Sequence, residues 1–291
     1  MNVVAYRLRP TAPWVTPWHA DSLFGALCWT LLRRRGEDSL RKMLGGFREG
    51  APPFLLSDGC PGEWLPRPLV LLRNGGSAWR SHEWITRDDF LTARRGEVPN
   101  GPAQTPVEPF ETRRSRRFSS AESGLFETQE WTWSEAWPVE QRFLTVYARI
   151  LPEWVTPLAR LFEALGQYGF GKRRTLGRGV FTVDEPVPCD WLEPLRFEDG
   201  YVALNRFIPH QTDPVKGCWT VHVKYPKYGD EFSSGGQASK GRIAQLGPGS
   251  CFQFPGRPKR WYGTMLANLP HHPEALHYGL ALAIGMKWPK A

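Results

Sequence analysis

The sequence has few cysteines, no long apolar run and no leader-like beginning, and each absence excludes a class of protein. Its 291 residues include five cysteines but no CxxC pair that would start a zinc or redox site. We expect these cysteines to be small, reduced, buried side chains of a cytoplasmic protein. The stretch MNVVAYRLRP has no signal-peptide core, and the apolar stretch LHYGLALAIGM is too short to span a bilayer. The sequence therefore predicts neither export nor membrane insertion.

The motifs of nucleotide-dependent and metal-dependent enzymes are incomplete or absent. Residues 166–172 match the first part of a Walker A pattern, but Arg173 stands where Ser or Thr must bind magnesium. The loop also precedes a predicted strand instead of opening a helix, so the helix N-terminus that cradles a pyrophosphate is missing. There is no DxD motif or acidic cluster, and the C-terminal histidines lack HExxH spacing. We expect no cofactor and no metal.

The charge balance favours a polyanionic partner. Lys and Arg number 37 against 29 Asp and Glu, which gives a net charge of +8 and a pI near 9.4. Hydrophobic residues make up 41% and charged residues 23%, which is ordinary for a globular protein with a real core. The length suits one large or two medium domains, and we expect two.

Periodicity in the first half predicts alternating strands and helices. Residues 3–9 alternate as a half-buried strand, and a helix with Asp21 as its N-cap follows and stops at Gly36. The next predicted elements are a short helix over 38–47, a strand over 69–72, a strand over 141–151, a helix from 152 to about 165 ended by Gly166, and a strand over 180–183. This order predicts a ferredoxin-like βαββαβ domain with a long insertion.

A Pro-rich stretch, residues 185–194, marks the best domain boundary, which predicts an N-terminal domain over 1–184 and a C-terminal domain over 185–291. Strands are predicted in the second domain over 201–208, 218–225, 250–254 and 277–284, with little helix. The insertion in the first domain lies at about 96–130. Residues 96–124 combine Pro, Gly, Ser and Arg, which predicts an exposed, mobile excursion.

The most informative stretch is Gly169-Phe-Gly-Lys-Arg-Arg-Thr-Leu-Gly-Arg-Gly179, between a predicted helix and a predicted strand. Glycine permits positive φ and a close approach of the backbone to phosphate oxygens. Four cationic side chains and no acid within the stretch favour a nucleic-acid backbone. The alternative is a turn that only connects a helix to a strand.

Two further basic stretches suit single-stranded RNA, which is bound by cationic grooves and by stacking of splayed bases. Residues 112–118 place four arginines beside Phe118, and residues 224–242 combine Lys, Arg, Gly and Ser. Each stretch can equally be an exposed, solvated loop.

These markers together resemble a known family. After the first strand, His19-Ala-Asp-Ser-Leu-Phe-Gly-Ala-Leu27 resembles the S/T-D-x-[LIF]-F-G-A-[LI] opening of the Csm 5′-handle-binding subunit, a RAMP protein of the Cas five group. The excursion ending in Gly124-Leu-Phe126 resembles that family's thumb-like hairpin, and YGFGKRRTLGRGVF resembles its glycine-rich loop. Residues 246–252 resemble its "GS.F" strand, and LHYGLA resembles its closing strand. The markers follow the family order over nearly the whole chain.

The resemblance implies an α+β fold of two ferredoxin-like (RRM-like) domains with a long thumb-like insertion in the first. It implies a non-catalytic subunit of a type III-A effector complex that caps the 5′ handle of the CRISPR guide RNA, without a cofactor. Its partners would be the guide RNA, the large cyclase-bearing signature subunit and a backbone RAMP subunit, with target RNA nearby and no membrane. The family's acidic, Asn-rich approach to the thumb is replaced here by TRRSRRF, which leaves open whether the thumb faces guide or target.

Residue types and the resemblance together select a set of RNA-binding candidates. They are His19, Ser22, Arg113, Arg114, Arg116, Arg117, Gly169, Gly171, Lys172, Arg173, Arg174, Gly177, Arg178, Gly179, Lys224, Lys227, Ser234, Gln237, Lys240, Gly249 and Ser250. Two other functions stay open at this point. The first is a metal-independent, repeat-processing RAMP endoribonuclease with His19 as general acid or base. The second is a scaffold whose basic loops contact an acidic protein.

Overall fold

The first half of the chain builds a sheet around β1 (Asn2–Pro10). The structure is a computed structural model that describes residues 1–74, 77–102, 108–119, 124–192, 194–195, 198–229, 232, 238–254 and 258–289. β1 pairs antiparallel with β8 (Leu144–Ile150), from Asn2 opposite Ile150 to Leu8 opposite Leu144. The outer strands are β2 (Phe54–Leu56) and β3 (Cys60–Pro61) beside β8, and β9 (Phe181–Val183) and β10 (Val187–Pro188) beside β1.

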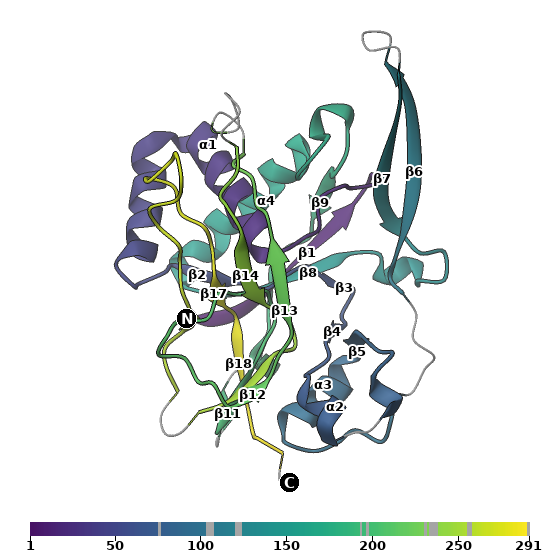
Figure 1. The fold of residues 1–291 in the computed structure, drawn as a ribbon, viewed down its shortest axis with the longest axis vertical. Coiled ribbons are helices and arrows are strands. Elements are labelled where there is room, and N and C mark those ends of the chain that lie inside the picture. Colours follow the sequence, from purple (N-terminus) through teal and green to yellow (C-terminus); the bar gives the residue numbers. More distant parts are fainter. Residues whose placement is uncertain are drawn as a thin grey trace.

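Two helices, α1 (Ala20–Arg48) and α4 (Val155–Tyr168), pack on this sheet (Figure 1). The Tyr6 ring on β1 lies 5.3 Å from the Phe162 ring on α4, and the Tyr6 hydroxyl donates to the Val155 carbonyl. Phe24 on α1 contacts Phe54 on β2. Among the elements along the chain, β1, α1, β2, β8, α4 and β9 occur in this order, and β2 rather than the predicted strand over 69–72 follows α1 in the sheet.

The ends of these helices differ from the sequence prediction. His19, not Asp21, is the N-cap of α1, and the first N–H group, that of Ala20, donates to Asp58 from the segment between β2 and β3. Gly36 (φ 76°, ψ 177°) is non-helical and divides α1 into two helical segments that meet at a kink, so the predicted stop at Gly36 and the predicted second helix over 38–47 are both observed. α4 continues past Gly166, because this glycine lets the helix approach the Phe181 carbonyl, where a Cβ atom would lie only 2.2 Å away.

The prediction of a strand over residues 69–72 is wrong, because these residues belong to a small insert with a short helix. Leu71 donates its N–H to the Pro68 carbonyl and Leu72 donates to Leu69, as in a helical turn. A short apolar run fits either a buried strand or a buried helical turn, so the sequence pattern could not distinguish them. The insert contains β4 (Leu65–Pro66), α2 (Val70–Asn74), η1 (Ser77–Trp79), β5 (Trp84–Ile85) and α3 (Arg87–Arg94).

The Arg-rich region forms a long hairpin of β6 (Phe110–Ser119) and β7 (Gly124–Trp133), which projects beyond the rest of the fold (Figure 1). Its base is fixed by an aromatic cluster, in which the Trp14 ring lies 5.5 Å from Phe110 and 5.9 Å from Trp133. The predicted excursion over 96–124 therefore contains a regular strand where no periodicity was apparent in the sequence.

The second half forms a four-stranded antiparallel sheet in the order β12 (Gly217–Cys218), β15 (Cys251–Gln253), β11 (Gly200–Ala203), β18 (Ala283–Met286). A separate ribbon joins β13 (Val221–Lys224) to β14 (Ile243–Leu246), and β16 (Tyr262–Gly263) pairs with β17 (Leu280–Ala281). From residue 194 onward the described residues contain no α-helix. In the described ranges, no helix combines the length and apolarity needed to cross a bilayer.

The two halves share one hydrophobic core. Val202 and Ile284 of the second sheet belong to the same buried cluster as Leu27 and Val146 of the first half. Three further short helical turns are η2 (Val139–Gln141), η3 (Pro152–Trp154) and η5 (Asp190–Leu192). The last of these lies in the stretch expected as the domain boundary, which is thus part of the packed structure.

Arg94, at the end of α3, fixes the insert to the second half. Its side chain is 1% exposed and donates from Nε to the Gly285 carbonyl and from Nη1 to the Trp191 carbonyl, with Glu198 at 3.6 Å. A buried guanidinium with these partners cannot be removed without leaving polar groups unsatisfied.

We expect Arg94→Leu to lower the free energy of unfolding by about 3 kcal/mol. The substitution leaves two carbonyls and a largely buried carboxylate without their guanidinium partner. The neighbouring Arg95 is 52% exposed and serves as the control. Arg95→Leu should change stability by less than about 0.5 kcal/mol. Urea denaturation followed by tryptophan fluorescence measures both, and equal effects of the two substitutions would contradict the assigned role.

Candidate nucleic-acid interface

The glycine-rich loop, residues 169–179, joins α4 to β9 and is closed on itself. Gly169, Gly171, Gly177 and Gly179 all have φ between 69° and 81°, which favours glycine at each position. Phe170 is buried, and its N–H donates to the Gly179 carbonyl at 2.8 Å. The loop contains one helical turn, η4 (Arg174–Leu176).

Close packing explains three of these glycines, since a Cβ atom on Gly169 would lie 2.6 Å from the Arg178 carbonyl oxygen. A Cβ atom on Gly171 would lie 2.3 Å from the Thr16 side chain, and one on Gly179 would lie 2.2 Å from the Phe170 carbonyl oxygen. Gly177 has open space around it. The loop is therefore held tightly at its base, whereas its tip at Thr175, Leu176 and Gly177 is exposed.

The four cations of the loop differ in their surroundings. Lys172 is exposed, and Arg173 and Arg174 are half-buried. Arg178 forms an ion pair with Glu130 of β7, Nε to Oε1 at 2.8 Å, with the two side chains 20% and 6% exposed. Glu130 thus neutralises Arg178 and ties the loop to the base of the hairpin. The sequence showed no acid in the loop, and nothing local predicted a partner from another element.

Residues 13–19 connect the glycine-rich loop to the N-terminus of α1. Gly179 donates to the Pro13 carbonyl, and the Lys172 N–H donates to the Thr16 hydroxyl at 2.9 Å. The Trp18 ring lies 4.7 Å from the Phe170 ring. Since the chain then enters α1 through His19, two of the predicted site segments are in fact adjacent.

A buried carboxylate joins α1 to the second half. Asp21 is 2% exposed and pairs with Lys224 of β13, Nζ to Oδ2 at 2.7 Å. The same ammonium donates to the Ser22 hydroxyl at 3.1 Å. Gln245 donates to Asp21 at 3.4 Å, and His277 Nε2 lies 3.4 Å from the carboxylate. The structure therefore brings His19, Ser22 and Lys224 together, around an aspartate that was not among the predicted site residues.

Burial and neighbouring charges shift the pKa values of this cluster. Burial raises the pKa of Asp21, but the Lys224 ammonium and His277 outweigh it and hold that pKa at about 2. Burial, helped by Arg206 and Lys224, lowers the pKa of His19 to about 3, so its imidazole is neutral at pH 7. Burial also lowers the pKa of His277 to about 4.

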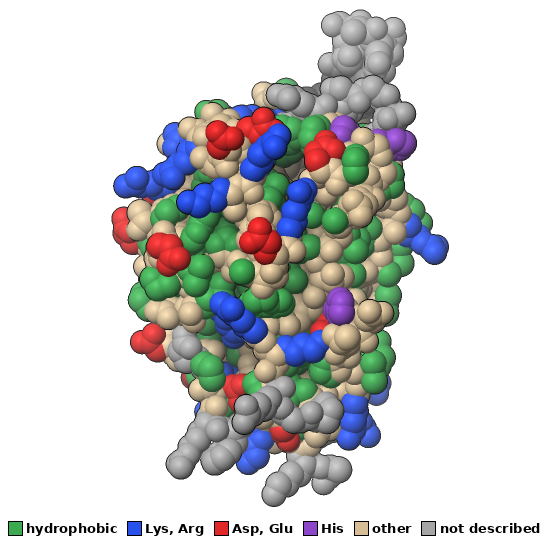
Figure 2. All heavy atoms as spheres, turned by 90° about the vertical axis from the view of Figure 1, so that its left-hand side faces the viewer, with side chains coloured by type: hydrophobic (Ala, Val, Ile, Leu, Met, Phe, Trp, Pro, Cys, Tyr) green, Lys and Arg blue, Asp and Glu red, His purple; other side chains and the backbone are tan. Residues whose placement is uncertain are grey.

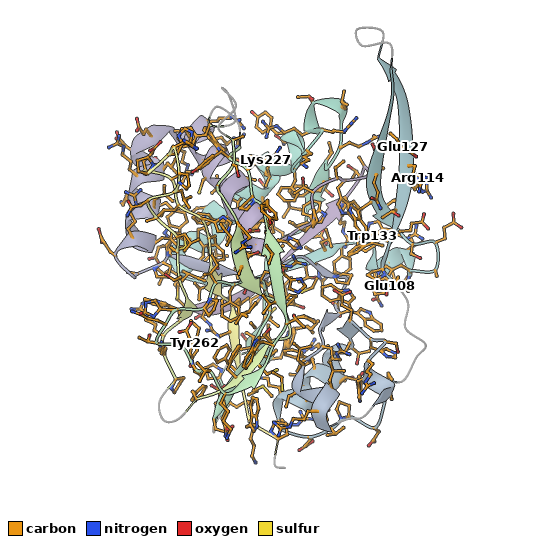
Figure 3. All side chains as sticks on the ribbon, in the orientation of Figure 1. Glu108, Arg114, Glu127, Trp133, Lys227 and Tyr262 are labelled. Atoms are coloured by element: carbon orange, nitrogen blue, oxygen red, sulfur yellow. The ribbon has the colours of Figure 1, made fainter. Side chains whose placement is uncertain are left out.

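The remaining candidates of the second half have different environments. Lys227 is exposed near the upper end of the ribbon (Figure 3), and Lys240 Nζ lies 5.3 Å from the centre of the Tyr228 ring. Gly249 and Ser250 are buried, with the Ser250 hydroxyl donating to the Gly247 carbonyl, so these two positions serve the packing of the fold. Ser234 and Gln237 lie outside the described residues.

The hairpin arginines do not contact the glycine-rich loop through any described pair. Arg113 lies 3.1 Å from Glu111 and 3.9 Å from Glu135, and Arg114 lies 3.6 Å from Glu127 (Figure 3). Arg113 is 60% and Arg114 77% exposed, so these pairs stay hydrated. Arg116 and Arg117 occupy β6 opposite Glu127 and Phe126, and their side chains lie outside the described structure.

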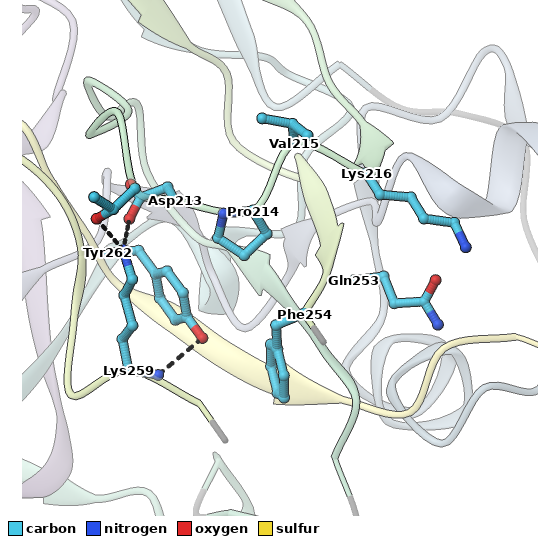
Figure 4. A pocket seen from close by; sticks show the side chains of 9 residues that line it. Asp213, Pro214, Val215, Lys216, Gln253, Phe254, Lys259 and Tyr262 are labelled. Carbon is cyan, nitrogen blue, oxygen red and sulfur yellow. Dashed lines mark hydrogen bonds and ion pairs between the residues drawn. The ribbon is translucent and has the colours of Figure 1, made fainter. Parts of the chain in front are cut away.

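Other surfaces offer less to a polyanion or a metal. On the face at the α1 side, Lys and Arg side chains are interspersed with Asp and Glu (Figure 2). A cavity of about 610 Å³ in the second half is lined by Phe254 and Tyr262, but its Lys259 is already paired with Asp213 at 2.9 Å (Figure 4). Within the described ranges, no three His, Cys, Asp or Glu side chains converge as metal ligands would.

Comparison with solved structures identifies the fold. A chain in the crystal structure of a Csm1–Csm4 cassette in complex with AMPPNP matches with a TM-score of 0.65 and 17% identity over 100% of both chains. A chain in the Csm3–Csm4 subcomplex of the type III-A CRISPR-Cas interference complex matches with a TM-score of 0.64 and 12% identity, over 99% of this chain and 100% of that one. The chain has a Csm4-like fold. The family resemblance inferred from the sequence markers is thereby confirmed at the level of the fold.

The likeness is structural and not detectable in the sequence as a whole. No protein-family model matches the chain, and no curated protein sequence matches it. A Cmr-beta chain is similar over 64% of the residues, with a TM-score of 0.37, which is too low to support an argument.

We expect stability to fall as the pH is lowered from 7 to 5, in part because of His277. An unfolded histidine binds a proton near pH 6.5, whereas folded His277 does so only near pH 4, so the unfolded state binds more protons between these values. The proton bound by His277 in the unfolded state should alone lower the free energy of unfolding by about 2 kcal/mol at pH 5, relative to pH 7. Urea denaturation at both pH values should therefore show a smaller loss for His277→Gln than for the wild-type chain. An equal loss in both proteins would contradict this assignment.

Proposed function

We propose that the chain is a non-catalytic, RNA-binding subunit of a type III-A effector complex that holds the 5′ handle of the guide RNA. The observation that carries this proposal is the continuity of the glycine-rich loop, residues 13–19 and the α1 N-terminus in a chain with a Csm4-like fold. These segments are the ones that the sequence markers selected for RNA.

The chemistry of the loop supports a sugar–phosphate ligand. Lys172, Arg173 and Arg174 follow one another on a backbone fixed at Thr16 and Phe170. Three adjacent cations without an acid among them attract consecutive phosphates, and a fixed backbone limits the entropy lost on binding. At the start of α1 the Ala20 N–H donates to Asp58 and the Ser22 hydroxyl donates to Asp21, so the cations of the loop rather than the helix N-terminus are the groups offered to an anion.

The names of the structural neighbours support the proposed partners. Csm4 is paired with Csm1 in one of these solved structures and with Csm3 in the other. We infer that this chain likewise binds a large cyclase-bearing signature subunit and a backbone RAMP subunit, and that its hairpin is a thumb close to guide or target RNA. Its contribution would be positional, since fixing one end of the guide sets the register of the complex.

The division into domains over 1–184 and 185–291 belongs to the same proposal. The order β1, α1, β2, β8, α4, β9 in the first half supports a ferredoxin-like unit, and the antiparallel sheet of β12, β15, β11 and β18 supports a second, helix-poor unit of related design. The shared core means that the two units would unfold together.

Replacing Lys172, Arg173 and Arg174 together with Ala should weaken binding of a single-stranded repeat RNA at least tenfold at moderate salt. The slope of log affinity against log salt should fall by about 2, since each lost phosphate contact in single strands contributes roughly 0.7. The control replaces Arg41, Lys42 and Arg95, which are exposed elsewhere, and lowers the net charge equally. Fluorescence anisotropy at several salt concentrations measures both, and identical slopes would contradict the proposed interface.

The alternative function, a metal-independent endoribonuclease, finds little support in the geometry of His19. With a pKa near 3 its imidazole is neutral at pH 7, so it cannot act as an imidazolium general acid and is only a weak general base, and Asp21 and His222 are among the groups that influence it. His19 remains able to accept a hydrogen bond from RNA.

We therefore expect purified protein to leave repeat RNA intact during incubation with EDTA at pH 7. Denaturing gel electrophoresis of end-labelled RNA measures this, with His19→Ala as a control for contaminating nuclease. A discrete product that His19→Ala abolishes would establish the enzyme instead.

A further inference from the structure

A stripe of exposed apolar side chains follows β13. Trp219 is 47%, Val221 61%, Val223 55% and Tyr225 68% exposed, and Val215 just upstream is 81% exposed. Half of the large hydrophobic side chains that are exposed in the described structure fall within residues 215–225. Scattered exposed apolar residues are normal on a protein surface, but a concentration of this kind marks an interaction site.

The stripe occupies the outer face of the ribbon because side chains alternate along a strand. Lys224 points inward and is held there by Asp21 at 2.7 Å, and His222 also lies on the inner side, against Gly247. Val221 and Val223 therefore point outward, whereas the half-exposed Trp219 ring, which precedes β13, stacks on Phe252 at 5.6 Å. Since the inner face is fixed by a buried ion pair, the outer face cannot turn in to bury its apolar groups.

One edge of β13 is open. The strand pairs with β14 on one side, and no other strand among the described residues pairs with it. Gly247 donates to the Thr220 carbonyl, so by the alternation of antiparallel bonding His222 and Lys224 direct their backbone groups toward β14. Val221 and Val223 then direct their N–H and C=O groups toward the open edge, where another strand can pair.

The surroundings of the stripe are cationic. Two lysines, Lys216 and Lys227, are exposed at its two ends, whereas the Lys224 ammonium is paired with Asp21 on the inner side. An occupant with apolar side chains at its centre and carboxylates at its ends would match this surface.

We propose that β13 is a docking edge to which a protein partner adds a strand, with apolar side chains at alternate positions and acidic residues at its ends. Two valines at the centre of the stripe have no π-face for a base to stack on, whereas they suit cross-strand contacts with aliphatic side chains. Strand addition also uses the open backbone groups of Val221 and Val223. The inference rests on the proposed function in one respect, the choice of partner, which is a protein subunit of the effector complex.

The test uses two variants that address side chains and backbone separately. Val221→Thr with Val223→Thr keeps β-branched residues but removes apolar surface. Val223→Pro removes an N–H group at the open edge without removing a bond to β14. The control, Val139→Thr with Val187→Thr, makes the same chemical change at two valines that are 70% and 41% exposed elsewhere. Circular dichroism and the thermal midpoint establish that each variant is folded.

Binding is measured by calorimetry, without RNA, against the purified signature and backbone subunits with which this chain is proposed to assemble. We expect one of them to bind the wild type and the control equally, and both β13 variants at least tenfold more weakly. Unchanged affinity in the folded β13 variants would overturn the proposal, as would a failure of both subunits to bind the wild type. A wild-type chain that self-associates through β13 in sedimentation would assign the edge to a second copy and also overturn it.

RNA affinity, measured on the same samples, separates this inference from the proposed function. Both β13 variants should bind repeat RNA as the wild type does. Loss of RNA binding in them, with subunit binding intact, would show that the stripe serves RNA and refute the docking edge. A wild-type chain that binds a subunit through β13 but does not bind RNA would refute the proposed handle-binding role and leave the docking edge standing.

Discussion

The ion pair between Asp21 and Lys224 is the constraint on which the arrangement of the two halves depends. A carboxylate that is 2% exposed must be paired, and its main partner comes from the other half of the chain. Removing one member of such a pair typically costs about 3–5 kcal/mol, because the other charge stays buried. The pair therefore fixes the α1 N-terminus against β13 and, through the alternation of the strand, determines which side chains of β13 face solvent.

This constraint also changes which charges are available to a ligand. Lys224 is occupied by Asp21, and Arg178 by Glu130, so neither contributes a free positive charge at neutral pH. His19 is neutral because burial and nearby cations oppose its protonation. Within the glycine-rich loop, the exposed ammonium of Lys172 remains a charge that can attract a polyanion.

The periodicity of apolar residues predicted the strands and helices whose formation depends on burying one face. The alternation in β1 and β8 and the apolar spacing in α1 and α4 were sufficient to predict these four elements, because burying one face of each element dictates those periods, whereas β2 was not predicted and the run over 69–72 was misassigned. The pairing of Asp21 with Lys224, and of Arg178 with Glu130, joins distant segments and leaves no trace in sequence spacing. Gly249 and Ser250 matched a family marker, yet both are buried. A sequence motif can therefore reflect packing of the fold as well as contact with RNA.

The glycine-rich loop shows how packing and function divide within one motif. Gly171 and Gly179 are required by the Thr16 side chain and the Phe170 carbonyl, so they would be retained even in a chain that bound nothing. Lys172, which lies between these glycines, has no such packing role, because its side chain is exposed and the residue is held through its backbone N–H. A tight base beneath an exposed, cationic segment is preorganised, and preorganisation favours binding by reducing the entropy lost when the ligand arrives. The glycines therefore act on the ligand indirectly, by holding the backbone that carries the charges.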